Sequence, residues 1–303
     1  SKAVAFNRFV VEAPVIAEGN GKAVAYRVAG LDASGMLEQW WDMSRAADLE
    51  AFEAALSRLQ VPVFNVLYAD RDGHILYVFN GRVPKRPGGT YLDWLGAVSG
   101  DTSETLWTDY LSYHELPRVL DPPSGWLQNA NDPPWTSTFP AALDPARYPP
   151  FLAPQFMHFR AQQSASLLAA DQSISFEELV AYKHWTVMLL ADRLVDDLVA
   201  AAREHGSATA RAAAEVLAEW DRTADADSRG AVLFERWAER MELGRTAFLL
   251  DEGSRQLMRE TFVKPWDPGA PFTTPAGLKD PERASAVLDA VAREVVDEYG
   301  KVI

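Results

Sequence analysis

The sequence contains no cysteine and few basic residues, and both shortages exclude classes of function. Without a cysteine among its 303 residues, the chain has no disulfide, no thiolate nucleophile and no zinc–thiolate site. Lys and Arg number 29 against 43 Asp and Glu, which gives a net charge of −14. Nucleic-acid binding draws its affinity from clustered cations, and no basic patch occurs here. We therefore expect no nucleic-acid partner.

Long apolar runs and several common catalytic motifs are also missing. No run of 18 apolar residues occurs, so we expect no membrane span. The sequence lacks G-x-S-x-G, G-x-G-x-x-G and phosphate-loop motifs, which argues against many serine hydrolases, dinucleotide enzymes and nucleoside triphosphatases. Its five histidines have no metal-ligand spacing, and Asp192, Asp196 and Asp197 have the pattern of a solvated helix face. Composition and spacing alone therefore identify no complete set of catalytic residues, and we assign neither a metal nor a cofactor.

What is present indicates a folded α+β protein. Apolar residues make up 48% of the chain and include ten tryptophans, enough for a substantial core. In the first half, β-branched and aromatic runs surround turn sequences at residues 18–22 and 70–73, which predicts two hairpins. Between them, Asp48 is a plausible N-cap of a helix with one apolar stripe, formed by Leu49, Phe52, Leu56 and Leu59.

The second half has a different character. From Gly81 to about Pro154 the chain is rich in Pro, Gly and Trp and has no lasting apolar period, which is typical of a functional or fitted loop. Ser175 and Glu178 then form a capping box ahead of a continuous helical pattern. Further helices are expected near 208–220, 230–243 and 282–299. We predict a strand- and loop-rich part, residues 1–153, and a mainly helical part, residues 154–303.

One loop segment, "GWLQNANDPPW" at residues 125–135, carries three side-chain amides. Asn and Asp side chains often bond to their own backbone in turns, and Pro133 with Pro134 stops regular pairing. Local chemistry therefore explains the segment as a turn, and it leaves open whether any of the amides serves a substrate.

Four stretches stand out when they are taken in order: "LYADRDGHILYVFNGRVPKR" (67–86), "SGWLQNANDPPW" (124–135), "WDRTADADSRGAVLF" (220–234) and "PWDPGAPFTTPAGLKDP" (265–281). Together they resemble the penicillin acylase family. The resemblance covers roughly residues 10–299 and depends on the ordered set of motifs. It implies an N-terminal nucleophile hydrolase, in which a precursor cleaves itself and the new N-terminal Ser supplies both a hydroxyl nucleophile and an amine base. The double proline, Pro133 and Pro134, resembles the sequence found at this point in the subgroup of aculeacin, acyl-homoserine-lactone and cephalosporin acylases.

The resemblance implies a role for the amide-rich loop. In the family, the last Asn of the N-x-N segment, here Asn131, points its side-chain N–H at the oxyanion of the tetrahedral intermediate. Asn129 and Gln128 are then expected to hold the loop in shape.

Three more site residues follow from the same resemblance. Arg160, within "RAQQSASLL", matches the Arg that stands near the N-terminal amine and keeps it neutral by like-charge repulsion. Trp41 and Phe64 fall where the family's acyl-binding pocket has its walls. The alternative for Arg160 is an ordinary place on a helix surface. The alternative for Phe64, and for one member of the Trp40–Trp41 pair, is packing into the core.

One departure from the family pattern sets the expected extent of the chain. Ser1 stands in "SKAVAFNRF", without the residues that follow the family's nucleophile. We therefore expect Ser1 not to be the nucleophile, and the chain to be an interior part of a β subunit that is inactive alone. Its partners would be the α subunit and the rest of the β subunit of the same precursor.

The implied activity is hydrolysis of a linear amide in a small N-acyl substrate, such as an acyl-homoserine lactone, a β-lactam side chain or a lipopeptide. The resemblance also implies a periplasmic or secreted full-length parent. Some relatives hold a structural calcium, but no ligands for it can be placed here. The alternative is a noncatalytic ligand- or peptide-binding module that uses a Trp-rich surface between Trp94 and Trp135.

Overall fold

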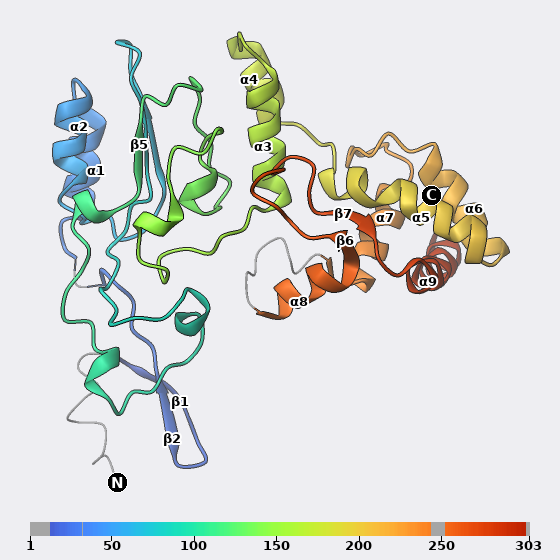
Figure 1. The fold of residues 1–303 in the computed structure, drawn as a ribbon, viewed down its shortest axis with the longest axis horizontal. Coiled ribbons are helices and arrows are strands. Elements are labelled where there is room, and N and C mark those ends of the chain that lie inside the picture. Colours follow the sequence, from blue (N-terminus) through green and yellow to red (C-terminus); the bar gives the residue numbers. More distant parts are fainter. Residues whose placement is uncertain (1–12, 32, 244–251, 301–303) are drawn as a thin grey trace. The chain divides into compact units, whose positions relative to one another are not determined.

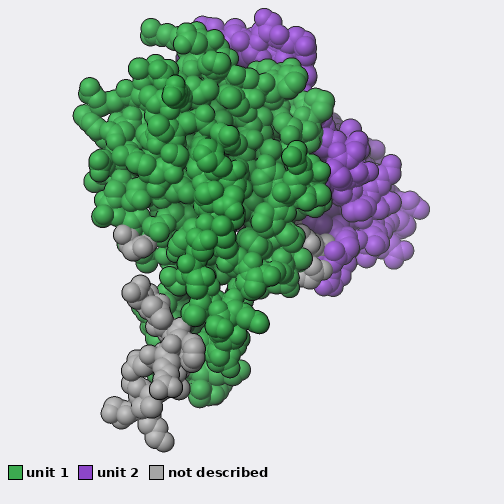
Figure 2. All heavy atoms as spheres, turned by 60° about the vertical axis from the view of Figure 1, so that its left-hand side comes forward, with its two compact units in different colours: residues 1–155 green, residues 156–303 purple. Residues whose placement is uncertain are grey.

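The computed structural model describes residues 13–31, 33–243 and 252–300. The chain divides into two compact units, Ser1–Gln155 and Phe156–Ile303, which Figure 2 shows in different colours. Strands and helices occur in both units, so the predicted α+β class is confirmed (Figure 1). Ser1 lies outside the described residues, and the expectation about it stays a prediction.

Two β-hairpins organise the first unit, and both were predicted. Strands β1 (Val15–Gly19) and β2 (Lys22–Ala25) pair antiparallel across a turn whose Asn20 and Gly21 have positive φ, 52° and 73°. Positive φ at both central residues is what a two-residue hairpin turn of type I′ requires. Strands β3 (Val66–Ala69) and β4 (Ile75–Val78) form the second hairpin, and β5 (Arg118–Leu120) pairs with β4 to complete a sheet of order β3-β4-β5.

Two helices accompany this sheet. Helix α1 spans Met36–Arg45 and α2 spans Leu49–Leu56. The predicted cap is confirmed, because Asp48 Oδ1 accepts the backbone N–H of Ala51 at 2.8 Å. The apolar stripe of α2 packs with residues of the sheet, as Phe52 shows by its ring contact with Tyr68 at 4.6 Å between centroids.

The rest of the first unit is loop, as the composition indicated. Short 3₁₀ turns interrupt the loop, and its buried apolar side chains form a separate cluster: Leu111, Leu116, Trp135, Leu152 and Ala153. Trp135 belongs to that cluster and donates its Nε1–H to Pro154 O at 2.9 Å. The expected Trp-rich surface is therefore wrong at Trp135, which is buried. The 3₁₀ turns are η1 (Leu92–Trp94), η2 (Ser103–Thr105), η3 (Tyr113–Glu115), η4 (Pro134–Thr136) and η5 (Pro145–Arg147).

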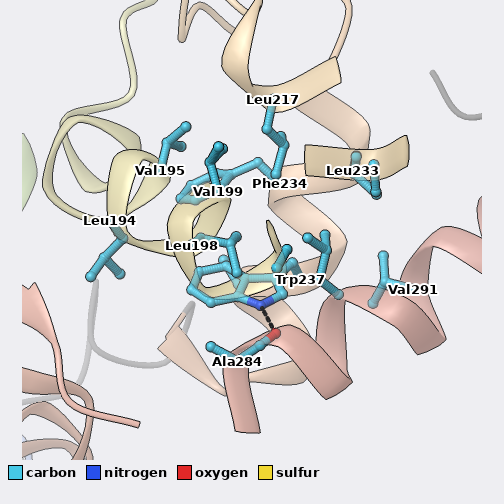
Figure 3. Close-up of a cluster of buried hydrophobic side chains, with 14 of the residues drawn as sticks. Leu194, Val195, Leu198, Val199, Leu217, Leu233, Phe234, Trp237, Ala284 and Val291 are labelled. Carbon is cyan, nitrogen blue, oxygen red and sulfur yellow. Dashed lines mark hydrogen bonds between the residues drawn. The ribbon is translucent and has the colours of Figure 1, made fainter. Parts of the chain in front are cut away.

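The second unit is a helical bundle with one small antiparallel sheet. Its core is apolar and well buried, and Trp237 at its centre donates its Nε1–H to Ala284 O at 3.0 Å (Figure 3). The elements are α3 (Phe159–Ala170), α4 (Phe176–Lys183), α5 (Leu189–His205), α6 (Ala208–Ala218), α7 (Ala231–Arg240), α8 (Glu252–Thr261), β6 (Phe262–Lys264), β7 (Ala276–Leu278) and α9 (Pro281–Tyr299).

The continuous helix expected after Ser175 is wrong in one respect. The predicted capping box is present, but α4 ends at Lys183 and α5 begins only at Leu189. Between them the backbone pairs with a distant loop: Ala224 donates to Thr186 O at 3.0 Å, and Met188 donates to Arg222 O at 2.8 Å. These long-range hydrogen bonds outweigh the local helical pattern.

The acidic residues of α5, Asp192, Asp196 and Asp197, lie on an exposed helix face, as expected, and all three also have partners. Asp192 and Asp196 form ion pairs with Arg222 at 3.2 and 2.6 Å. Asp197 Oδ2 accepts the backbone N–H of Leu278 at 2.9 Å, which ties α5 to β7. In the described part of the chain, no helix is long and apolar enough to cross a membrane.

Candidate functional site

A buried carboxylate organises the amide-rich loop. Asp132 is 2% exposed and accepts hydrogen bonds from Ala130 N at 2.8 Å, from Gln128 Nε2 at 2.9 Å and from the hydroxyl of Thr136. A buried charge is tolerated when several donors surround it in this way. Asp132 was not among the residues predicted from the sequence, although it is the centre of the loop.

Two of the three amides close the turn, as predicted. Asn129 Oδ1 accepts the backbone N–H of Asn131 at 3.0 Å, and Asn129 Nδ2 donates to Asp132 O and Oδ1, both at 3.2 Å. Gln128 Nε2 also donates to Thr136 O at 2.7 Å. The expectation that Asn129 and Gln128 hold the loop is confirmed.

Asn131 differs from its neighbours. Its backbone is left-handed, with φ of 64°, a conformation that Asn tolerates better than most residues. Its side chain is exposed, and within the described residues its amide forms no hydrogen bond. The turn interpretation therefore accounts for Asn129 but leaves the Asn131 amide able to donate to another molecule. Its catalytic role stays a prediction.

Phe64 lies on a strained segment next to this loop. It is 58% exposed and has φ of 98°, which costs about 1–3 kcal/mol for a bulky residue. Within this chain, therefore, Phe64 does not pack into the core. The following residue, Asn65, donates its Nδ2–H to Asn129 Oδ1 at 2.9 Å. The structure thus brings the Phe64 segment and the Asn131 loop together.

Trp41 is presented by α1 and is 62% exposed. Trp40 is 45% exposed, so the expectation that one of the pair packs into the core is wrong. The guanidinium of Arg45 lies over the Trp41 ring, 5.5 Å from its centroid. Core packing of α1 instead uses Gln39 and Met43.

Gln39 connects α1, the helix that carries Trp41, to the segment of residues 60–65 that contains Phe64. Its buried Oε1 accepts the backbone N–H groups of Gln60 at 2.6 Å and Val61 at 3.3 Å. Asn80 Nδ2 donates to Val61 O at 3.0 Å from the other side. Buried amides thus fix the start of the segment and Asn65 fixes its end. Sequence reasoning missed Gln39 and Asn65, although an amide at an inward helical position, i and i+4 with Met43, was a usable signal.

A buried tyrosine lies close to the loop's carboxylate. Tyr77 of β4 is fully buried, and burial together with the charge of Asp132 raises its pKa well above the usual value. The phenol therefore stays neutral. Among the described residues its hydroxyl finds no hydrogen-bond partner.

Arg160 lies elsewhere in the chain, on the first turn of α3, and its side chain is exposed. Asn131 belongs to the first unit and Arg160 to the second, so the proximity expected for them stays a prediction. In the described part of the chain, no group of three or more His, Asp or Glu side chains is placed to hold a metal ion.

Comparisons with known proteins agree with these motifs. The chain is 28% identical over 308 residues to the acyl-homoserine lactone acylase PvdQ of Pseudomonas savastanoi pv. phaseolicola, and 28% identical over 256 residues to aculeacin-A acylase of Actinoplanes utahensis. These matches cover 92% and 70% of this chain but only 37% and 32% of those two proteins. The chain thus spans about a third of the length of these curated relatives.

The fold has a solved counterpart. A thermostable penicillin G acylase from Alcaligenes faecalis matches with a TM-score of 0.61 and 20% identity, over 95% of this chain and 56% of that chain. This shows that the chain shares the fold of that enzyme. The family model described as penicillin amidase matches residues 8–302. The chain belongs to the penicillin amidase family.

Proposed function

We propose that this chain is part of an acylase that hydrolyses the linear amide bond of a small N-acyl substrate. Membership of the penicillin amidase family supports the reaction class. The observation that supports the site is the contrast within one loop: Asn129 and Gln128 are held by hydrogen bonds, whereas the Asn131 side-chain amide is exposed and forms no hydrogen bond within the described residues.

The proposed nucleophile is an N-terminal Ser of the mature β subunit, upstream of residue 1. Its own amine takes the hydroxyl proton, the oxygen attacks the substrate carbonyl, and the amine leaving group departs after receiving that proton. Water then hydrolyses the acyl-enzyme by the same route. Arg160 is proposed to keep the α-amine neutral by like-charge repulsion.

Asn131 is proposed to stabilise the tetrahedral intermediate. A neutral donor held by a preformed turn needs no reorganisation when the oxyanion develops, and one such hydrogen bond contributes on the order of 3 kcal/mol. Trp41 and Phe64 are proposed to bind the apolar acyl group, because both present large apolar side chains at the surface of the first unit.

The decisive test is made on the full-length precursor after maturation. Asn131→Gly removes the donor but keeps the left-handed backbone, so we expect kcat to fall about 100-fold or more with little change in KM. Asn20→Gly is the matched control, since Asn20 is also exposed with positive φ, 52°, in a hairpin turn. An Asn131→Gly enzyme with unchanged kcat would remove the proposed role.

The isolated 303 residues give a second test. We expect no hydrolysis of an acyl-homoserine lactone or a phenylacetyl amide, because the covalent step lacks its nucleophile. Turnover that is abolished by Ser1→Ala would reassign the nucleophile to Ser1. The full-length parent is further proposed to be periplasmic or secreted, which fractionation of cells expressing the intact gene would check.

A further inference from the structure

We propose that Asn65 is a positioning residue that couples the acyl-binding segment to the oxyanion donor. The inference rests on the proposed function of Asn131 and goes beyond it, because it assigns a role to a residue outside the motif loop. Asn65 follows Phe64 directly and contacts Asn129, which in turn fixes the backbone of Asn131.

A single oxygen atom joins the two segments. Asn129 Oδ1 accepts Asn65 Nδ2 at 2.9 Å and the backbone N–H of Asn131 at 3.0 Å. Both of its lone pairs are therefore used, and its orientation depends on both donors. Asn65 and Asn129 are half-buried, so water competes less for these hydrogen bonds than at an open surface.

The segment that carries Asn65 is suited to transmit a displacement. Val61 is fixed through its N–H by Gln39 and through its C=O by Asn80, at 3.3 and 3.0 Å. Phe64, three residues later, has the strained φ of 98° and an exposed side chain. An acyl group that packs on Phe64 therefore contacts a short segment, residues 61–65. Hydrogen bonds hold this segment at Val61 and, through Asn65, at Asn129.

The chemistry at position 65 calls for a neutral donor. A carboxylate there would face Asn129 Oδ1 with another acceptor, which removes one hydrogen bond and adds repulsion. It would also add negative charge beside the loop that is proposed to receive an oxyanion. Asn65→Asp is nearly isosteric, so it changes the hydrogen bond while leaving the volume of the side chain almost unaltered.

The test is a double-mutant cycle on the matured full-length enzyme, with an N-acyl substrate that Phe64 can contact. We expect Asn65→Asp to lower kcat about 10-fold in the wild-type background and less than twofold in the Asn131→Gly background. KM should change less than kcat. A merely structural role would lower kcat by the same factor in both backgrounds, and that result would overturn the coupling.

The controls separate this inference from the proposed function. Asn20→Asp makes the same chemical change in a distant turn and should leave kcat unaltered in both backgrounds. If Asn131→Gly alone leaves kcat unchanged, the proposed function fails. If Asn131→Gly lowers kcat while Asn65→Asp does not, only the coupling fails.

Maturation of the precursor is followed by mass spectrometry in every variant, and Asn65→Ser provides a second variant, in which a neutral hydroxyl donor replaces the amide donor. It should lose less kcat than Asn65→Asp. If neither Asn65 variant matures while Asn20→Asp does, Asn65 serves folding rather than turnover and the proposal is overturned.

Discussion

The side-chain oxygen of Gln39 accepts a hydrogen bond from the backbone N–H of Gln60 at 2.6 Å, and the same oxygen accepts Val61 N at 3.3 Å. Gln39 and Val61 are both buried, so the Val61 N–H cannot turn to water if this acceptor is lost, and the N–H of the half-buried Gln60 loses the same acceptor. We expect Gln39→Leu to lower the free energy of unfolding by about 2–3 kcal/mol, because buried donors are left unsatisfied. Denaturant unfolding measures this difference.

The control for Gln39→Leu lies two residues along the same helix. Trp41→Leu changes an exposed side chain and should alter the unfolding free energy by no more than about 0.5 kcal/mol. Equal losses for the two variants would show that Gln39 does not anchor the segment.

Phe64→Gly is expected to raise the stability of the protein and to weaken substrate binding. Phe64→Gly relieves the positive φ of 98°, so the variant should be more stable by about 1 kcal/mol. The same change removes the apolar ring proposed to contact the acyl group, and kcat/KM for a long-chain substrate should fall about 10- to 100-fold. Thermal unfolding and steady-state kinetics on the full-length enzyme measure the two effects. A variant that loses stability would contradict the strain argument.

Tyr77→Phe should stabilise the first unit. The phenol is fully buried near Asp132 and, in the described part of the chain, has no hydrogen-bond partner. Removing a buried polar group without a partner recovers its desolvation cost, so we expect a gain of about 1 kcal/mol in unfolding free energy. A loss of similar size would show that the hydroxyl is hydrogen-bonded in solution, for example through a buried water. Tyr68→Phe provides the contrast, since Tyr68 donates to Asp70 at 2.9 Å.

Local features were predictable from the sequence and distant ones were not. The cap at Asp48, the turn glycine Gly73 and the capping box at Ser175 depend on neighbours within a few residues, and each formed as expected. The break after Lys183 depends on Arg222, whose carbonyl binds Met188 N. No periodicity within the helix itself encodes such a partner.

In the candidate site, too, contacts between neighbouring residues were predictable and contacts between distant residues were not. The amide-rich loop stood out because its residues are adjacent, and its internal bonds followed from ordinary turn chemistry. Asn65 is 64 positions from Asn129, and Gln39 is 22 positions from Val61, so only the fold brings these pairs together. Sequence reasoning therefore found the amide-rich loop but missed Asn65, which binds Asn129 of that loop, and Gln39, which fixes the segment before Asn65.

The His74–Asp121 pair predicts a pH dependence of stability. His74 Nδ1 lies 2.8 Å from Asp121 Oδ2, and Asp121 Oδ1 accepts Ile75 N at 2.8 Å, which joins the β3–β4 turn to the end of β5. The hydrogen bond with Asp121 raises the pKa of His74, and Asp70 and Asp72 act in the same direction. The hydrogen bond with His74 lowers the pKa of Asp121.

The signs of these two shifts define a window for the His74–Asp121 pair. The His74 contribution is complete below about pH 6.5 and is lost as pH rises through its raised pKa, whereas the Asp121 contribution is complete above about pH 4 and is lost as pH falls through its lowered pKa. The difference in Tm between wild type and His74→Gln should therefore be largest between about pH 4 and 6.5. Both groups are exposed, so about 1 M salt should reduce the difference. A difference that increases from pH 6 to 9 would show that the neutral imidazole, not the ion pair, stabilises this turn.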